Sequence, residues 1–133
     1  MTTTEYLAAI HLALVESSVV VSYTVVRQRI TSQSEHIRVC INLVDGDFLE
    51  AAEFFRLTPE GIEVADYRHQ WMDGQRTFLR KRWDSAPHYP QLPNAPHHYH
   101  DGSEEVVNPG QPMSIQDVLA FIAREIQSSD PHQ

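Results

Sequence analysis

The 133-residue chain has a single cysteine, Cys40, and no long hydrophobic run. One cysteine cannot form a disulfide within one chain, and no cysteine cluster is present that could bind zinc through thiolates. No apolar run approaches the roughly 20 residues that a helix needs to span a bilayer. No basic side chain precedes the first apolar stretch, so we expect no signal peptide. These absences predict a single soluble domain over residues 1–128, a disordered tail over 129–133, and a cytoplasmic location.

Basic side chains are also scarce, with 10 lysines and arginines against 18 aspartates and glutamates and a net charge of −8. This balance argues against a generic nucleic-acid binder, because phosphate contacts supply most non-specific affinity. The charge is unevenly distributed, however. Residues 67–100 carry a net charge of +3 and five of the eight histidines, whereas the rest of the chain carries −11. The segregation predicts either a solvated basic strand or a local anion-binding site on an acidic protein.

Two segments have the periodicity of amphipathic helices. In residues 3–17 apolar side chains recur at helical spacing, and Thr2 with Glu5 fits a capping box. In residues 114–128 the apolar side chains form one stripe, and Ser114 is a favourable N-cap. Each stripe needs an apolar surface, so at least one helix should pack on a sheet face.

The segments between the two helices have the pattern of strands and tight turns. Apolar and polar side chains alternate most clearly over residues 37–43, and Asp73-Gly74 is a two-residue hairpin signal. The predicted strands comprise residues 18–31, 37–43, 48–57, 62–71 and 75–83. Tight turns between consecutive strands imply an antiparallel meander. The predicted fold is therefore α+β: an N-terminal helix, a five-stranded antiparallel meander sheet, a proline- and histidine-rich loop and a C-terminal helix.

Residues 84–113 form that predicted loop, because they hold six of the eight prolines. A long ordered loop in a compact domain is commonly functional. Four histidines fall within 13 residues of it, with two aspartates close by: His88, His97, His98 and His100, with Asp84 and Asp101. His11 and His36 are separate from this cluster, and we interpret them as ordinary surface or packing residues.

Imidazole is the side chain best suited to proton transfer near neutral pH. Two histidines can cleave RNA without a metal, since one removes the proton of the 2′-hydroxyl and another protonates the leaving oxygen. The same histidines could instead bind a divalent transition metal. In a third interpretation the prolines and histidines merely line a rigid loop. Adjacent histidines point in different directions, so at most two of His97, His98 and His100 should converge on one site.

The strands before the loop supply candidate phosphate- and base-binding residues. Pairing the fourth and fifth predicted strands about Asp73-Gly74 puts Arg68 on one face. The other face mixes aromatic rings with guanidinium groups: Tyr67, His69, Trp71, Arg76, Phe78, Arg80 and Arg82. Such a face can stack bases and hold phosphates, although it could equally be an exposed face of aromatic–arginine pairs or one partly covered by a helix. The candidates are Arg68, Arg80 and Arg82 for phosphate and Tyr67 and Trp71 for stacking.

The C-terminal half of the sequence resembles the TumE-like family of bacterial toxins. The resembling stretches are YRHQWMDG (residues 67–74), RWDSAPH (82–88), LP (92–93) and PHHYH (96–100), with weaker similarity at Val106, Pro109 and the terminal helix. The resemblance implies the toxin of a type II toxin–antitoxin module. It also implies a cognate antitoxin as partner, a helix-turn-helix DNA-binding protein.

Three hypotheses remain open from the sequence. The favoured one is a ribonuclease toxin without an obligatory cofactor, in which the four loop histidines include the acid and the base and Asp84 orients a histidine. The second is a metal-dependent nuclease or hydrolase that uses the same loop. The third is a non-enzymatic binding module. The β-branched strand over residues 18–31 could also expose an edge that pairs with a second copy or with an antitoxin strand.

Overall fold

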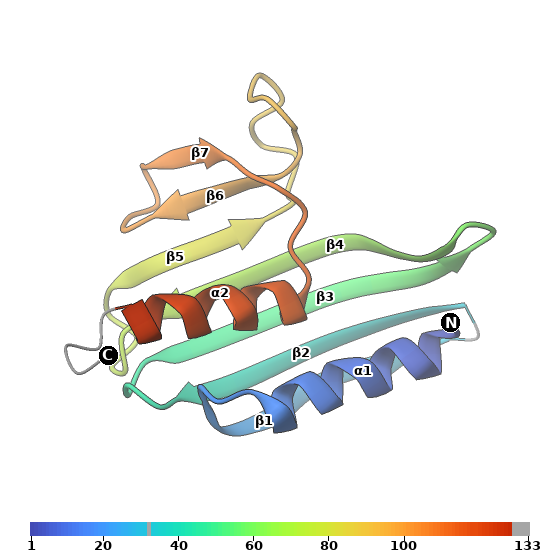
Figure 1. The fold of residues 1–133 in the computed structure, drawn as a ribbon. Helices are drawn as coiled ribbons and strands as arrows, with labels where there is room; N and C mark the ends of the chain where they lie inside the picture. Colours follow the sequence, from blue (N-terminus) through green and yellow to red (C-terminus); the bar gives the residue numbers. More distant parts are fainter. Residues whose placement is uncertain (32, 129–133) are drawn as a thin grey trace.

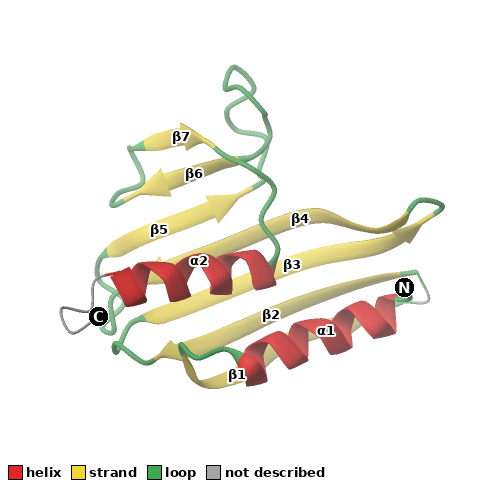
Figure 2. Ribbon diagram, viewed as in Figure 1, coloured by secondary structure: helices red, strands yellow, loops and turns green. Residues whose placement is uncertain are grey.

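The computed structural model describes residues 1–31 and 33–128, so the predicted tail at 129–133 lies outside the described residues. The described chain is one antiparallel sheet with two helices (Figures 1 and 2). In chain order the elements are α1 (Thr3–Glu16), β1 (Val20–Ile30), β2 (Ser34–Leu43), β3 (Phe48–Thr58), β4 (Gly61–Met72), β5 (Leu79–Asp84), β6 (His98–Asp101), β7 (Val107–Pro109) and α2 (Ile115–Ser128). The predicted α+β class and meander order are confirmed, since each strand pairs with the next.

Over residues 1–31 and 33–128 the sheet has seven strands, so the prediction of five was wrong. The two additional strands, β6 and β7, lie inside the segment predicted to be an irregular loop. Four of its prolines precede β6, and Pro109 ends the edge strand β7, where a missing N–H does not interrupt an inner ladder. These prolines therefore lie before β6 and at the end of β7, where they do not prevent the two short strands from forming.

The connection between β4 and β5 also differs from the prediction. It is not a two-residue hairpin turn, because β4 ends at Met72 and β5 begins only at Leu79. The Asp73 carboxylate accepts hydrogen bonds from the backbone N–H groups of Thr77 and Phe78, both at 2.7 Å, and stabilises this longer loop. The register consequently pairs Arg68 with Asp84 and Gln70 with Arg82. The predicted face was wrong, because the longer loop puts Arg82 on the opposite side from Tyr67.

Both helices cover the same face of the sheet, which leaves the other face open (Figure 2). The predicted helix starts are confirmed, with a capping box at Thr2 and Glu5 and reciprocal bonds between Ser114 and Asp117. The buried core between helices and sheet is aliphatic and aromatic, and includes Ile10, Leu14, Ile37, Val39, Ile41, Leu49, Phe55, Ile115, Val118 and Ile122. None of the helices in the described chain is long and apolar enough to cross a membrane.

One carboxylate, that of Glu53 on β3, is fully buried where both helices meet the sheet. It accepts hydrogen bonds from the Tyr6 hydroxyl of α1 and, at 2.9 Å, from the Ile115 N–H at the start of α2. Burial raises the pKa of Glu53 above its ordinary value. Glu53 therefore joins both helices to the sheet through hydrogen bonds. Its burial costs free energy when the carboxylate is ionised.

We expect Glu53→Gln to flatten the pH dependence of stability. Above the ordinary carboxyl pKa of about 4.3 the unfolded chain loses its proton first, so the folded wild type loses stability as pH rises towards the raised pKa. The glutamine does not titrate, but its amide cannot accept both hydrogen bonds, which costs about 1 kcal/mol. Urea unfolding from pH 5 to pH 8 should find the variant about 1 kcal/mol less stable at pH 5, with a gap that narrows as pH rises. Parallel stability curves for the two proteins would contradict this account of Glu53.

Candidate functional site

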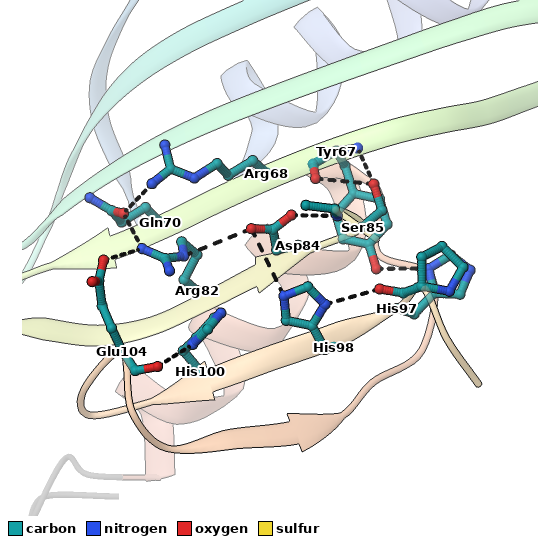
Figure 3. A network of polar contacts seen from close by, with 12 residues as sticks. Tyr67, Arg68, Gln70, Arg82, Asp84, Ser85, His97, His98, His100 and Glu104 are labelled. Atoms are coloured by element: carbon teal, nitrogen blue, oxygen red, sulfur yellow. Dashed lines mark hydrogen bonds and ion pairs between the residues drawn. The ribbon is translucent and has the colours of Figure 1, made fainter. Parts of the chain in front are cut away.

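A polar cluster lies on the open face of the sheet where β5 and β6 pair (Figure 3). Arg82 is directly opposite His100, and Asp84 is directly opposite His98. Directly opposed residues project from the same face, and alternation along each strand keeps both pairs on that face. The His-x-His spacing on a strand therefore brings His98 and His100 together.

Asp84, His98 and His100 form the centre of the cluster. One carboxylate oxygen of Asp84 and one ring nitrogen of each histidine lie within 4.8 Å of one another. All three residues are buried, with relative exposures of 9%, 2% and 3%. The Asp84 Oδ2 atom is 4.0 Å from His98 Nε2, and the N–H of Ala86 donates to Asp84 Oδ1 at 2.7 Å. The backbone after β5 thus fixes the carboxylate that faces the two imidazoles.

The protonation of both imidazoles follows from their backbone partners. His98 Nδ1 lies 2.9 Å from the carbonyl oxygen of Pro96, and His100 Nδ1 lies 2.9 Å from that of Glu104. A carbonyl only accepts hydrogen bonds, so Nδ1 carries the proton in each neutral ring. Each Nε2 then has a free lone pair. These two nitrogens and the Asp84 carboxylate can together hold a proton in transit or a metal cation.

Arg82 supplies the fixed positive charge of the cluster. Its Nη1 donates to Glu104 Oε1 at 2.8 Å and to Gln70 Oε1 at 3.3 Å, and its Nε lies 4.0 Å from Asp84 Oδ2. Burial lowers the pKa of His100, and the nearby Arg82 and His98 lower it further. His100 is therefore a neutral base at neutral pH.

An aromatic ring packs against the cluster, and a hollow opens beside it. The Tyr89 ring from the proline-rich loop lies edge-on to His98 and His100, with centroid distances of 4.9 and 6.1 Å. Beside Asp84 a hollow of about 360 Å³ opens, lined by Arg68, Ser85 and their neighbours.

Sequence reasoning missed Tyr89, Gln70 and Glu104. No sequence pattern marks them, because they reach the cluster only through folding.

Other predicted site residues lie elsewhere. His97 stacks on the buried Tyr67 at 5.8 Å, and its Nδ1 lies 3.0 Å from the Tyr67 hydroxyl. Trp71 donates to Asp47 at 3.1 Å, and Arg80 donates to the same carboxylate at 2.9 Å. His88 is exposed in the loop, with its ring 6.5 Å from that of Tyr89. The structure therefore brings together Asp84, His98, His100, Arg82 and Arg68, but not the remaining candidates.

Comparison with known protein families gives a match that covers most of the chain. A family model described as "Toxin TumE" matches residues 9–128, nearly the whole chain and all of the cluster. No curated protein matches the sequence significantly. No solved structure matches it significantly either.

Proposed function

Because this chain belongs to the TumE toxin family, we propose that it is the toxin of a type II toxin–antitoxin pair and that it acts by cleaving RNA. The observation that carries the proposal is the convergence of Asp84, His98 and His100 in one buried cluster beside Arg82. As a member of a toxin family, the protein has a cognate antitoxin. Its proposed antitoxin is a helix-turn-helix protein, and the proposed site of action is the cytoplasm, where RNA is plentiful.

The proposed reaction uses the two imidazoles as base and acid. His100, neutral because its pKa is lowered, takes the proton of a ribose 2′-hydroxyl through Nε2. The 2′-oxygen attacks the adjacent phosphorus, and the bond from phosphorus to the 5′-oxygen breaks. Protonated His98 gives its proton to that leaving oxygen. The products are a 2′,3′-cyclic phosphate and a 5′-hydroxyl, and the proton count balances.

Charged neighbours support both ends of this reaction. The Asp84 carboxylate, 4.0 Å from His98 Nε2, faces and positions the ring that donates the proton. The exposed Arg68 lies opposite Asp84 in the register of β4 and β5. Arg68 and Arg82 can neutralise the charge that develops on the phosphate. Asp84 is thus a positioning residue, whereas His98 and His100 exchange protons with the substrate.

A metal-dependent nuclease is the second candidate, and one observation favours it. One ring nitrogen of each histidine and a carboxylate oxygen, all within 4.8 Å of one another, form a set of ligands that suits zinc, manganese or iron. Backbone carbonyls that accept from Nδ1 of both histidines are the usual support for metal-bound imidazoles. A cation held there would polarise a phosphate oxygen or activate a water.

A single experiment separates these candidates and tests the proposal. Purified wild type, Asp84→Asn and the matched control Asp101→Asn, which changes an exposed aspartate on β6, are incubated with labelled RNA with and without EDTA. We expect Asp84→Asn to lower the cleavage rate about 100-fold and the control to leave it unchanged, with EDTA having no effect. Loss of cleavage in EDTA, restored by a divalent metal, would favour the metal-dependent nuclease. Equal rates for all three proteins would contradict both.

A further inference from the structure

The open face of the sheet carries a row of arginines that leads away from the cluster. Consecutive register pairs join one residue from each of six strands, in the order Arg27, Arg38, Ala52, Arg68, Asp84 and His98. Directly opposed residues share a face, so the row crosses the sheet from β1 to the site. Four strand spacings of about 4.8 Å put Arg27 roughly 19 Å from Asp84.

A second row runs beside the first on the same face. It joins Arg29 of β1, His36 of β2 and Phe54 of β3. Burial lowers the pKa of His36, and so do the neighbouring charges of Arg27 and Arg38. His36 is therefore neutral at neutral pH, and with Phe54 it offers an aromatic surface among guanidinium groups.

Three adjoining hollows follow these two rows. The first, about 390 Å³, is lined by Arg27, Arg29, His36 and Phe54. The second, about 210 Å³, extends to Arg38 and Arg68. The third is the 360 Å³ hollow beside Asp84, and His36 lines all three. We call this continuous depression the basic groove and define its residues as Arg27, Arg29, His36, Arg38, Phe54 and Arg68.

The charge of the basic groove is largely unneutralised although the protein is acidic. Arg38 pairs with Glu50 at 2.8 Å, whereas in the described chain Arg27 and Arg29 form no ion pair. Within the part of the chain that the structure describes, the Arg68 side chain donates to the neutral Gln70, at 3.3 Å, and forms no ion pair. Besides Asp84, the carboxylates that line the hollows are Glu50, Asp66 and the buried Glu53. Four exposed guanidinium groups thus outnumber these three acidic side chains along the path to the site.

We propose that the basic groove binds a single-stranded RNA chain and leads it to the Asp84 cluster. Guanidinium groups on β1, β2 and β4 of one row can contact phosphates of an extended chain, and the aromatic surface beside them can stack a base. The inference rests on the proposed ribonuclease function and names its substrate as single-stranded RNA several nucleotides long. Arg27 and Arg38 are binding residues at a distance from the reacting phosphate.

The test compares Arg27→Ala/Arg38→Ala with Arg124→Ala, a control that removes an exposed arginine from α2. The probes are a decanucleotide made uncleavable by 2′-O-methyl groups, for binding, and an unmodified decanucleotide and dinucleotide, for cleavage. We expect the double variant to bind the decanucleotide about 100-fold more weakly. The slope of log affinity against log salt concentration should also become about 1.4 smaller in magnitude, because two phosphate contacts are lost. The KM of the unmodified decanucleotide should rise, whereas dinucleotide cleavage and the control should not change.

The outcomes separate failure of the groove from failure of the ribonuclease. Cleavage of both unmodified RNAs with no change in the double variant would overturn the basic groove alone. Binding of the decanucleotide without cleavage of any RNA would overturn the ribonuclease and with it the path to the site. Unchanged RNA affinity with weakened binding of the antitoxin would overturn RNA as the occupant in favour of an acidic antitoxin segment.

Discussion

Replacing His98 or His100 with alanine is expected to abolish growth arrest in bacteria that express this protein, whereas His97→Ala is expected to leave it toxic. The three histidines are close in sequence but separate in space. His98 and His100 each place a ring nitrogen within 4.8 Å of an Asp84 carboxylate oxygen, while His97 packs on Tyr67. Loss of a proton-transfer group typically lowers a rate by about 10²- to 10⁴-fold, enough to relieve toxicity.

The matched variant His97→Ala controls for folding. It removes one hydrogen bond and one ring contact from Tyr67, so we expect it to cost about 1–2 kcal/mol of stability without loss of chemistry. Growth curves after induction, with immunoblots and thermal unfolding of each purified variant, measure both effects. If His97→Ala relieved toxicity as fully as His98→Ala while remaining folded and equally abundant, the assignment of chemistry to the Asp84 cluster would be contradicted.

Removal of a single 2′-hydroxyl from the substrate is expected to stop cleavage at that position. In the proposed reaction this oxygen is the nucleophile, so its loss should reduce the rate by on the order of 10⁶-fold, the low end of enzymatic accelerations. The measurement uses an oligonucleotide with the mapped cleavage site either as ribose or as 2′-deoxyribose, and end analysis of the products. The ribose substrate should yield a 2′,3′-cyclic phosphate.

The same substrates distinguish the two candidate chemistries. A metal-dependent nuclease that activates a water does not need the 2′-hydroxyl. Efficient cleavage of the 2′-deoxy substrate would therefore contradict acid–base cleavage by His98 and His100. It would instead favour a cation held by Asp84, His98 and His100.

Local sequence signals predicted the parts of the fold that local interactions determine. Both helices and their caps are confirmed, because the Thr2–Glu5 and Ser114–Asp117 pairs lie three residues apart. The alternating strand over 37–43 is confirmed as part of β2, with its apolar side chains buried. The match to the family confirms the resemblance first seen in residues 67–100.

Features that depend on distant pairing were not predictable from local signals. Asp73 forms a loop instead of a tight turn, and this changed which residues share a face with Arg82. β6 and β7 are short strands among prolines. β6 pairs with β5, which places His98 and His100 opposite Asp84 and Arg82, whereas His97 precedes β6; β7 pairs with β6. Arg27 and Arg38 are far from the histidines in sequence, so only the register of the whole sheet connects them with the site.

The most direct test of the central claim is the rate at which purified wild-type protein and His98→Ala/His100→Ala cleave the same end-labelled single-stranded RNA in the presence of EDTA. Matched thermal unfolding would establish that both proteins are folded. We predict measurable cleavage by the wild type and a loss of at least about 100-fold in the double variant. No cleavage by the wild type, or equal rates for the two proteins, would contradict a ribonuclease centre built from His98 and His100.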